Sequence, residues 1–509
     1  MFCSILSSAV CGIVCKPVKI ELDMSGGMPL FTMIGSLSSN VRESQDRVRT
    51  ALKNMDIYLP PKRITVSISP GDIRKDGTRF DLPVAAALLV ALDKISAESV
   101  HNCMIMGELH LNGDTEGVAG ILPSVIAAKE MGISTCIVPY KNAAEAANAD
   151  GVDIVGVKHL SELIEYCTAE DKKSYIYKKE DSAQDSNLYP DFADIRGQSA
   201  VKRAALIAAA GFHNILMCGP PGSGKSMAAK RIPSILPPLT SSEQLEVSRI
   251  YSVSGLLSEQ SPIIKRRPFR SPHFSLSAQA LLGGGAIPKP GEITLAHRGV
   301  LFLDELPEMP GRVLEQLRGP LEDRCVTISR ALGSFTFPSH FLFVAAMNPC
   351  PCGYYPDMNK CTCTTSDINR YISRLSRPIL DRIDIRVNVP PPSYDVLKSP
   401  ASDSTGSDAM RSIVSDAFNI QKERYSQLDI CFNSELSPPD IKKFCTLTDE
   451  AERILETLFV KLDLSARAYH RILRLSRTIA DIEQADTICE AHISEAFTFR
   501  NANVSEAPK

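Results

Sequence analysis

The sequence contains no tryptophan, no apolar run that approaches the roughly 20 residues of a membrane span, and almost no net charge. The absence of tryptophan carries little weight. The short apolar runs predict a soluble protein with no membrane partner. The formal net charge of −3 excludes a bulk attraction to nucleic acid, so any such contact has to come from a local basic surface.

The 15 cysteines are odd in number and scattered, without the spacing of a small disulfide framework. That distribution predicts reduced thiols in the cytoplasm. The apolar start of the chain, residues 1–18, is similar to a signal peptide but lacks a basic beginning. We therefore expect a cytoplasmic protein. At 509 residues the chain is long enough for about three domains, each with its own core.

The most informative motif is a complete G-x-x-x-x-G-K-S phosphate loop. It consists of Gly219, Pro220, Pro221, Gly222, Ser223, Gly224, Lys225 and Ser226. An apolar run before it predicts a buried strand, and residues 227–232 after it predict a helix. The glycines let backbone N–H groups face a polyphosphate, Lys225 can reach the β- and γ-phosphates, and Ser226 can hold Mg²⁺. This order predicts an ATP site instead of a simple surface turn.

A second apolar run, residues 300–303, leads into Asp304 and Glu305. Alone, such a run usually marks a strand that meets solvent. About 80 residues after a phosphate loop, it predicts a Walker B strand. We expect Asp304 to orient Mg²⁺ and Glu305 to polarise the attacking water.

Four cysteines fall within 14 residues as two C-x-C pairs, Cys350 with Cys352 and Cys361 with Cys363. Four thiolates would give a tetrahedral site for Zn²⁺, of a structural kind because no coordination position stays open. C-x-C is a less usual ligand spacing than C-x-x-C. The sequence therefore leaves two interpretations open, a zinc site and four reduced thiols.

The pattern of strands, helices and polar stretches predicts an α/β multidomain fold. Residues 1–170 alternate strand and helix signals, and residues 191–392 hold the P-loop α/β core, including the cysteine cluster. Residues 413–509 have the apolar spacing of a helical C-terminal domain. Polar or proline-rich stretches over 171–190 and 393–412 predict linkers between these three domains.

Three motifs of the first domain resemble the proteolytic domain of Lon-type proteases, a ribosomal-S5-like α+β fold. They are Lys75-Asp76-Gly77, the helix start at Asp81 and the glycine motif at 117–121. Lon-type proteases use a Ser–Lys dyad, and the matching places hold Arg79 and Leu122. Because a dyad needs a hydroxyl and an amine, the resemblance implies a scaffold without proteolytic activity.

Residues 191–211 resemble the entry to an AAA+ ATPase module. In such modules apolar side chains grip the adenine, and Ile195 stands at that place. The resemblance gives Asn348, which follows the buried strand expected over 341–347, the role of sensor 1, a residue that helps to place the attacking water.

Two arginines match positions that contact the γ-phosphate in AAA+ proteins. The segment around Arg382 resembles the one that carries the arginine finger, which reaches the nucleotide of a neighbouring subunit. Arg374 and Arg377 lie nearby and compete for that role. Arg467 follows Ser465-Ala466 and resembles the start of the sensor 2 helix in the lid.

Two further segments match a ring pore that tracks a phosphate backbone and stacks bases. The insertion at 236–297 contains a basic stretch with aromatics at 265–274 and a glycine run at 283–285. Residues 325–337 predict a β-hairpin. A solvated loop and a structural hairpin explain the same residues equally well.

Taken together, these features resemble the ComM/YifB family, bacterial ATPases often labelled magnesium-chelatase-like. Segments 291–299 and 304–308 match that family beyond general AAA+ patterns. The resemblance implies ATP and Mg²⁺ as cofactors and a homo-hexamer that moves single-stranded or branched DNA, as a branch-migration helicase in recombination or natural transformation. Two other classes stay open: a magnesium-chelatase-type ATPase subunit, to which the Lon-like domain is foreign, and a regulator of an ATP-dependent protease.

Overall fold

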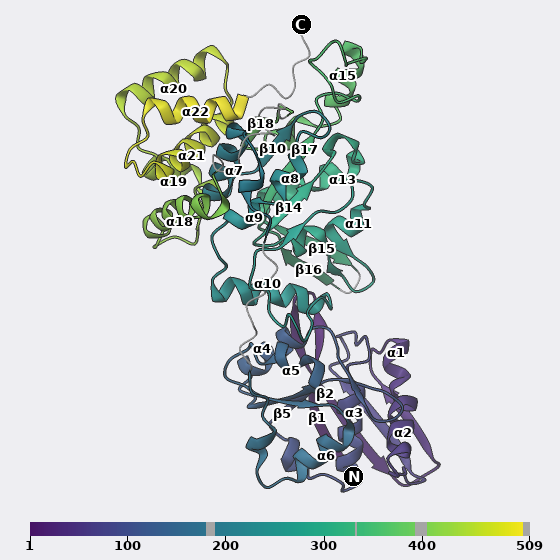
Figure 1. The fold of residues 1–509 in the computed structure, drawn as a ribbon. Helices are drawn as coiled ribbons and strands as arrows, with labels where there is room; N and C mark the ends of the chain where they lie inside the picture. Colours follow the sequence, from purple (N-terminus) through teal and green to yellow (C-terminus); the bar gives the residue numbers. More distant parts are fainter. Residues whose placement is uncertain (180–188, 331–332, 392–404, 502–509) are drawn as a thin grey trace.

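The computed structural model describes residues 1–179, 189–330, 333–391 and 405–501. Figure 1 shows a first lobe built from the N-terminal residues and a second lobe that holds the rest of the chain, with the C-terminal helices on one side of it. Among the described residues, no helix combines the length and the apolar character needed to cross a bilayer.

The first lobe is built on a mixed seven-stranded sheet with the order β3-β4-β2-β1-β5-β8-β9. Its strands are β1 (Phe2–Cys11), β2 (Val14–Ser25), β3 (Leu30–Ile34), β4 (Arg63–Ser69), β5 (Cys103–Ile105), β8 (Thr135–Pro139) and β9 (Asp153–Val157). The apolar start of the chain thus forms β1 and the beginning of β2, which pair antiparallel in the middle of the sheet. Several side chains of β1, such as Cys3, Ile5 and Ala9, are buried in the core of this lobe, which explains part of the apolar character.

The α-helices described in this lobe are α1 (Ser39–Arg42), α2 (Ser44–Asn54), α3 (Asp81–Ala91), α4 (Ile121–Glu130), α5 (Tyr140–Ala146) and α6 (Leu160–Thr168). Every residue of α3 is buried, which explains its unbroken run of apolar residues. Part of the linker expected over 171–190 lies outside the described residues. Of the remainder, Tyr177 donates its backbone N–H to the Ile154 carbonyl at 2.7 Å, so the chain still contacts the first lobe there.

The core of the second lobe is a parallel five-stranded sheet with the order β11-β14-β17-β10-β18. Its strands are β10 (Ile215–Cys218), β11 (Phe269–Arg270), β14 (Val300–Leu303), β17 (Leu342–Met347) and β18 (Ile385–Asn388). Strands β10, β14 and β17 are buried throughout, as expected where helices cover both faces of a parallel sheet. Because parallel strands end at one edge, the phosphate loop, the Walker B carboxylates and Asn348 all follow strands at the same edge.

The C-terminal helices are α18 (Ser407–Arg424), α19 (Pro438–Phe444), α20 (Asp449–Lys461), α21 (Ala466–Ile482) and α22 (Glu490–Asn501). Helix α18 begins inside the stretch 393–412 that the sequence marks as a linker. These helices share one hydrophobic cluster with the alanine-rich helix α7 (Ser199–Gly211) and with the sheet. Buried polar contacts add to it, such as the 2.7 Å hydrogen bond between His213 Nε2 and Thr478 Oγ1. The helical domain is therefore docked firmly on the core.

Helix α10 (Ser241–Val253), from the insertion of the second lobe, lies where the two lobes meet (Figure 1). Near its end, the Ser252 carbonyl accepts a hydrogen bond from Gly120 N–H at 2.9 Å, and the Ser252 hydroxyl donates to the Glu145 carboxylate. The Tyr251 hydroxyl donates to the Leu295 carbonyl of the second lobe at 3.0 Å. This helix therefore joins the two lobes through specific hydrogen bonds.

The turn between β1 and β2 makes a second contact between the lobes. It reaches the hairpin formed by β15 (Cys325–Arg330) and β16 (Gly333–Pro338). A side chain built at Gly12 in this turn would place its Cβ 3.3 Å from Cδ1 of Phe335. Ile13, the next residue, packs against the apolar cluster of the second lobe that contains Phe337. The hairpin thus rests on the first lobe at its aromatic side chains.

Candidate nucleotide site and arginine pocket

The phosphate loop adopts backbone conformations that glycine favours. Gly222 has φ +74° and Gly224 has φ +95°, both in the left-handed region. Gly219 is required for a different reason, because a Cβ there would lie 2.2 Å from the Val389 carbonyl oxygen. Helix α8 (Lys225–Ala229) begins directly after Gly224. The free N–H groups of its first turn therefore lie beside the loop, where they can bind the same phosphate.

Lys225 lies at the centre of this loop. Its Nζ donates to the carbonyls of Gly219 at 2.6 Å and Pro220 at 2.9 Å and to Asn348 Oδ1 at 3.1 Å. The side chain is only 8% exposed, and burial lowers its pKa, a shift that Asp304 partly opposes. The structure thus brings the lysine and the residue expected to act as sensor 1 into direct contact.

The residues expected to hold Mg²⁺ also meet. Ser226 Oγ donates to Asp304 Oδ2 at 2.6 Å, and Asp304 Oδ1 accepts from the Glu305 backbone N–H at 2.9 Å. A hydroxyl and a carboxylate in contact, open on one side to water and phosphate, are the donors that Mg²⁺ takes in P-loop proteins. Glu305 has φ +50° and an exposed side chain, so its carboxylate faces solvent instead of the core.

Two residues of the segment before α7 bear on this site in different ways. Ile195, expected at the adenine, is 5% exposed and packs in the apolar cluster that the core shares with the C-terminal helices. Gln198, which sequence reasoning missed, donates from Nε2 to the Ser223 carbonyl at 2.7 Å and to the Pro390 carbonyl at 3.3 Å. It holds the phosphate loop against the exit of β18. Its only signal in the sequence is its place before the alanine-rich helix.

The two arginines expected at the γ-phosphate lie together, away from the phosphate loop. Arg382 and Arg467 line one cavity of about 420 Å³, and of the described residues that line it, none belongs to the phosphate loop. Arginine and histidine side chains are prominent in the lining of this cavity. They are Arg324, His340, Arg382, Arg467, His470, Arg471 and Arg474. We call this cavity the arginine pocket.

Three carboxylates partly balance the arginine pocket. Arg471 pairs with Asp384 at 2.9 Å. Although burial opposes ionisation of Asp384, Arg471 holds the pKa of that carboxyl well below its usual value. Arg324 pairs with Glu435 at 2.8 Å. In contrast, Nε of Arg474 is buried without a hydrogen-bond partner among the described residues. The pocket therefore keeps an excess of positive charge.

The three candidates for the arginine finger differ in their freedom. Arg382 is 8% exposed, donates to the Pro378 carbonyl at 2.8 Å and pairs with Glu322. Arg374 pairs with Glu308 at 2.8 Å. Arg377, at the start of α16 (Arg377–Leu380), has an exposed side chain. Arg382 would have to leave Glu322 to reach a phosphate.

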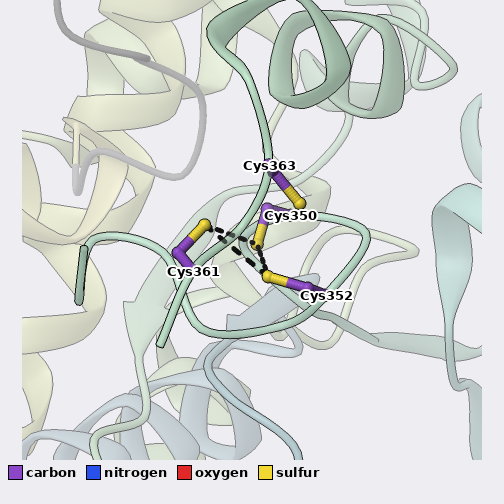
Figure 2. A group of neighbouring side chains, drawn as sticks. All are labelled: Cys350, Cys352, Cys361 and Cys363. Carbon is purple, nitrogen blue, oxygen red and sulfur yellow. Dashed lines mark hydrogen bonds between the residues drawn. The ribbon is translucent and has the colours of Figure 1, made fainter. Parts of the chain in front are cut away.

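The four cysteines of the C-x-C pairs converge on one point (Figure 2). All four Sγ atoms lie within 4.8 Å of one another. Three pairs are closer: Cys350–Cys352 at 3.3 Å, Cys350–Cys361 at 3.8 Å and Cys352–Cys361 at 3.6 Å. All four are free thiols. Zn–S bonds of about 2.3 Å in a tetrahedron put sulfurs about 3.8 Å apart, so this donor set fits a zinc ion.

Comparisons with known proteins place the chain. A family model described as magnesium chelatase, subunit ChlI, matches residues 191–397; models for subunit ChlI of Mg-chelatase and for its C-terminal part match 20–142 and 404–500. The competence protein ComM of Haemophilus influenzae is 40% identical over 501 residues, which cover 97% of each chain. The protein YifB of Escherichia coli is 40% identical over 492 residues, covering 97% of this chain and 96% of YifB. The chain belongs to the ComM/YifB family.

A shorter similarity supports the Lon-like character of the first lobe. Lon protease 2 of Bacillus subtilis is 31% identical over 140 residues, which are 26% of this chain and 25% of the protease. The fold expected from the sequence is thus confirmed: a Lon-like first domain, an AAA+ core of the magnesium-chelatase type and a helical C-terminal part. Members of this AAA+ ATPase family use ATP with Mg²⁺.

The places of the Lon dyad are buried in this ComM/YifB family member. Leu122 is fully buried. Arg79 is 4% exposed and donates to Ser124 Oγ at 3.0 Å and to the Gly120 carbonyl at 3.3 Å. Ser124, whose hydroxyl accepts from Arg79, is itself fully buried and donates to the Gly120 carbonyl. None of these groups is an accessible nucleophile paired with a base.

Much of the basic stretch 265–274 has a structural role in this family member. Arg267 is 4% exposed and donates to the carbonyls of Pro237 and Arg298. Arg270 forms a two-fold hydrogen bond with the Glu292 carboxylate at 2.7 and 2.8 Å. These two arginines stabilise the insertion, so this stretch is not a freely solvated basic loop.

The glycine run 283–285 lies close to the β15–β16 hairpin. Arg330, exposed at the end of β15, donates from Nε to the Gly285 carbonyl at 3.3 Å. Gly285 belongs to the glycine run, which forms a small hairpin from β12 (Gly283–Gly284) and β13 (Lys289–Pro290). The exposed Lys289 adds a second positive charge beside it. The two hairpins thus present backbone and basic groups side by side.

Proposed function

We propose that the protein is an ATP-driven ring motor that acts on DNA, a hexameric branch-migration helicase or translocase in recombination or natural transformation. The observation that carries this proposal is the division of the nucleotide chemistry between two places. Lys225, Ser226, Asp304, Glu305 and Asn348 lie at one edge of the sheet, whereas Arg382 and Arg467 line a separate basic pocket. A protomer with this arrangement holds two incomplete halves of a site, which neighbours in a ring complete for each other.

Within one protomer, we assign the following roles. Lys225 would exchange its carbonyl partners for the β- and γ-phosphates. Ser226 and Asp304 would hold Mg²⁺, which would supply positive charge beside the phosphates. Glu305 accepts a proton from the attacking water, for which its exposed carboxylate is suited. Asn348, already 3.1 Å from Lys225 Nζ, orients that water beside the γ-phosphate.

The neighbouring protomer supplies the arginines. Arg382 and Arg467 lie in one pocket, so both would approach the γ-phosphate from the same neighbour. Arg382 then exchanges Glu322 for phosphate, a change that ties hydrolysis to assembly. Arg377 is the exposed alternative on the same segment.

Contact with DNA is assigned to the paired hairpins, with Arg330 and Lys289 beside the glycine run 283–285. Backbone N–H groups and basic side chains contact phosphates without reading sequence, as a translocase requires. The name of the relative ComM, a competence protein, points to DNA as the polymer.

Two measurements test this proposal. Purified protein is expected to hydrolyse ATP faster with single-stranded or branched DNA than without it, and to form a hexamer with ATP in sedimentation experiments. In a mixing experiment, Arg382→Ala and Lys225→Ala proteins, each inactive alone, are expected to regain ATPase activity together, because a mixed interface combines an intact phosphate loop with an intact Arg382. An ATPase that stays monomeric and indifferent to DNA contradicts the proposal. If Arg377→Ala behaves as predicted for Arg382→Ala, the finger is Arg377.

The family description favours a second candidate, an ATPase subunit of a magnesium chelatase. Such a subunit drives metal insertion into a porphyrin and needs partner subunits. ATP turnover that responds to those partners and not to DNA would support it. A third candidate, a regulator of an ATP-dependent protease, predicts turnover that responds to a peptidase partner.

A further inference from the structure

The cysteine cluster lies directly against the nucleotide site. Asn348 and Cys350 are separated by one residue, and the Asn348 side chain contacts Lys225. From Cys350 the chain turns back, with Gly353 N–H donating to the Cys350 carbonyl at 3.0 Å. This turn brings Gly353 against the phosphate loop, where a Cβ at residue 353 would lie 2.5 Å from Cδ of Pro221. The loop that carries the cysteines therefore contacts both sensor 1 and the phosphate loop.

The other end of this loop leads toward the Walker B carboxylates. Cys363 is followed by Thr364, whose side chain caps helix α15 (Thr365–Ile372) in a capping box with Asp367. Just beyond α15, Arg374 pairs with Glu308, three residues after Glu305. The cysteine loop thus spans from the sensor 1 strand to the Walker B turn.

The cysteine loop, residues 350–363, buries few apolar side chains that could stabilise its conformation. Its cluster consists of three buried residues, Cys350, Cys361 and Ile368, with a few partly buried neighbours. So small a core cannot fix a loop of this length, and small protein units of this kind usually use a metal or disulfides. Here the sulfurs sit at distances that suit four thiolates around one ion, not disulfides. The ion would replace the missing core.

We propose that the four cysteines bind one structural Zn²⁺ ion per protomer and that this ion sets the position of Asn348 and of the phosphate loop, so that ATP turnover depends on its presence. Cys350, Cys352, Cys361 and Cys363 supply four sulfur ligands and leave no open position, so the ion does no chemistry itself. The dependence of turnover rests on the proposed ATPase activity, whereas zinc binding does not. The cysteines act as positioning residues through the backbone to Asn348 and Gly353.

The first experiment measures metal. Zinc content by mass spectrometry is expected to be one ion per protomer in the purified full-length protein. Cys361→Ser removes one of the four ligands and is expected to lower the zinc content. Because Asn348 and the phosphate loop then lose their support, kcat for ATP is expected to fall about tenfold. Cys431→Ser, which changes an exposed cysteine outside the cluster, is the matched control and is expected to keep both. Iron in place of zinc, or no metal even after zinc is added, overturns the assignment.

The second experiment separates positioning from folding. Gly353→Ala keeps all four ligands but forces a Cβ against Pro221 at φ +87°. This variant is expected to bind zinc and to melt at nearly the same temperature as the unmodified protein. Its kcat is expected to fall about tenfold, because a misplacement of less than 1 Å in the site has an effect of that size. Gly132→Ala, with φ +75° and open space around its Cβ, carries similar backbone strain far from the site and is the control. Equal kcat in both glycine variants overturns the positioning role.

The outcomes also distinguish this inference from the proposed function. If turnover depends on zinc and on Gly353 but not on DNA, the DNA motor is wrong and the zinc device stands. If DNA stimulates turnover in zinc-free protein as well as in the zinc-loaded form, the motor stands and the zinc device is wrong.

Discussion

The molecule contains two regions that resemble catalytic sites, and the structure treats them in opposite ways. In the nucleotide site, the half-buried Ser226 and Asp304 meet the exposed Glu305 at the edge of a sheet. In the Lon-like domain, Arg79 and Leu122 are buried where a dyad would stand. The comparison teaches that a fold alone does not determine an activity. Similar glycine motifs occur in the Lon-like domain, but the residue types and the solvent access of the site decide whether it can support a reaction.

Substitution of Glu305 is expected to have the largest effect. Glu305→Gln removes the base while it keeps the shape of the side chain, so hydrolysis is expected to fall about a thousandfold. Binding of a fluorescent ATP analogue is expected to persist. Glu456→Gln, at an exposed glutamate on α20, is the control. Undiminished hydrolysis in Glu305→Gln would refute the assigned base and remove the contrast between the two regions.

Placing dyad residues in the Lon-like domain tests the other side of the contrast. Leu122→Lys puts an amine at a fully buried position, which is expected to cost about 3 kcal/mol or more of unfolding free energy in urea titrations. Leu111→Lys, at a leucine that is 53% exposed, is expected to cost almost nothing. Arg79→Ser together with Leu122→Lys is expected to show no labelling by a fluorophosphonate serine probe. Labelling of that variant would show that the domain retains a usable catalytic cleft.

The smallest effect is expected at the contact between the two regions. Ser252→Ala removes the hydrogen bond to the Glu145 carboxylate, worth about 1.5–3 kcal/mol for a bond to a charged group. Hydrogen exchange at residues 117–125 is expected to rise, while ATP turnover without DNA stays the same. Ser254→Ala, whose hydroxyl donates within its own helix to Ile250, is the control. Equal exchange in both variants would mean that α10 does not hold the lobes together through this bond.

Sequence reasoning predicted the parts of the fold and the site that are local in the chain. The phosphate loop and the Walker B run are each contiguous in the sequence, and their residue types and separation predict a nucleotide site. The structure brings them together, with Ser226 donating to Asp304. The Lon-like domain followed from short glycine motifs that need a particular backbone. By contrast, the strand β1 was missed, because its apolar residues are similar to a signal peptide when no partner strand is known.

The arginine pocket could not be predicted as a unit. Its side chains come from segments as distant as Arg324, Arg382 and Arg471, and no local pattern indicates that they meet. The basic stretch around Arg267 shows the reverse case. Its charge looked free in the sequence, yet carbonyls that are distant in the chain bury and bind that guanidinium. Long-range packing decides such cases, and a single sequence carries no direct record of it.

The seat of the β15–β16 hairpin on the turn at Gly12 has a mechanical consequence. Phe335 lies against that turn, and Ile13 packs against the apolar cluster that contains Phe337. A movement of the hairpin away from the first lobe would break both contacts. In the proposed motor, a displacement of the hairpin would therefore be coupled to a movement of the Lon-like domain. If the chain works as such a motor, the Lon-like domain would move with the hairpin in each cycle of hydrolysis instead of staying fixed.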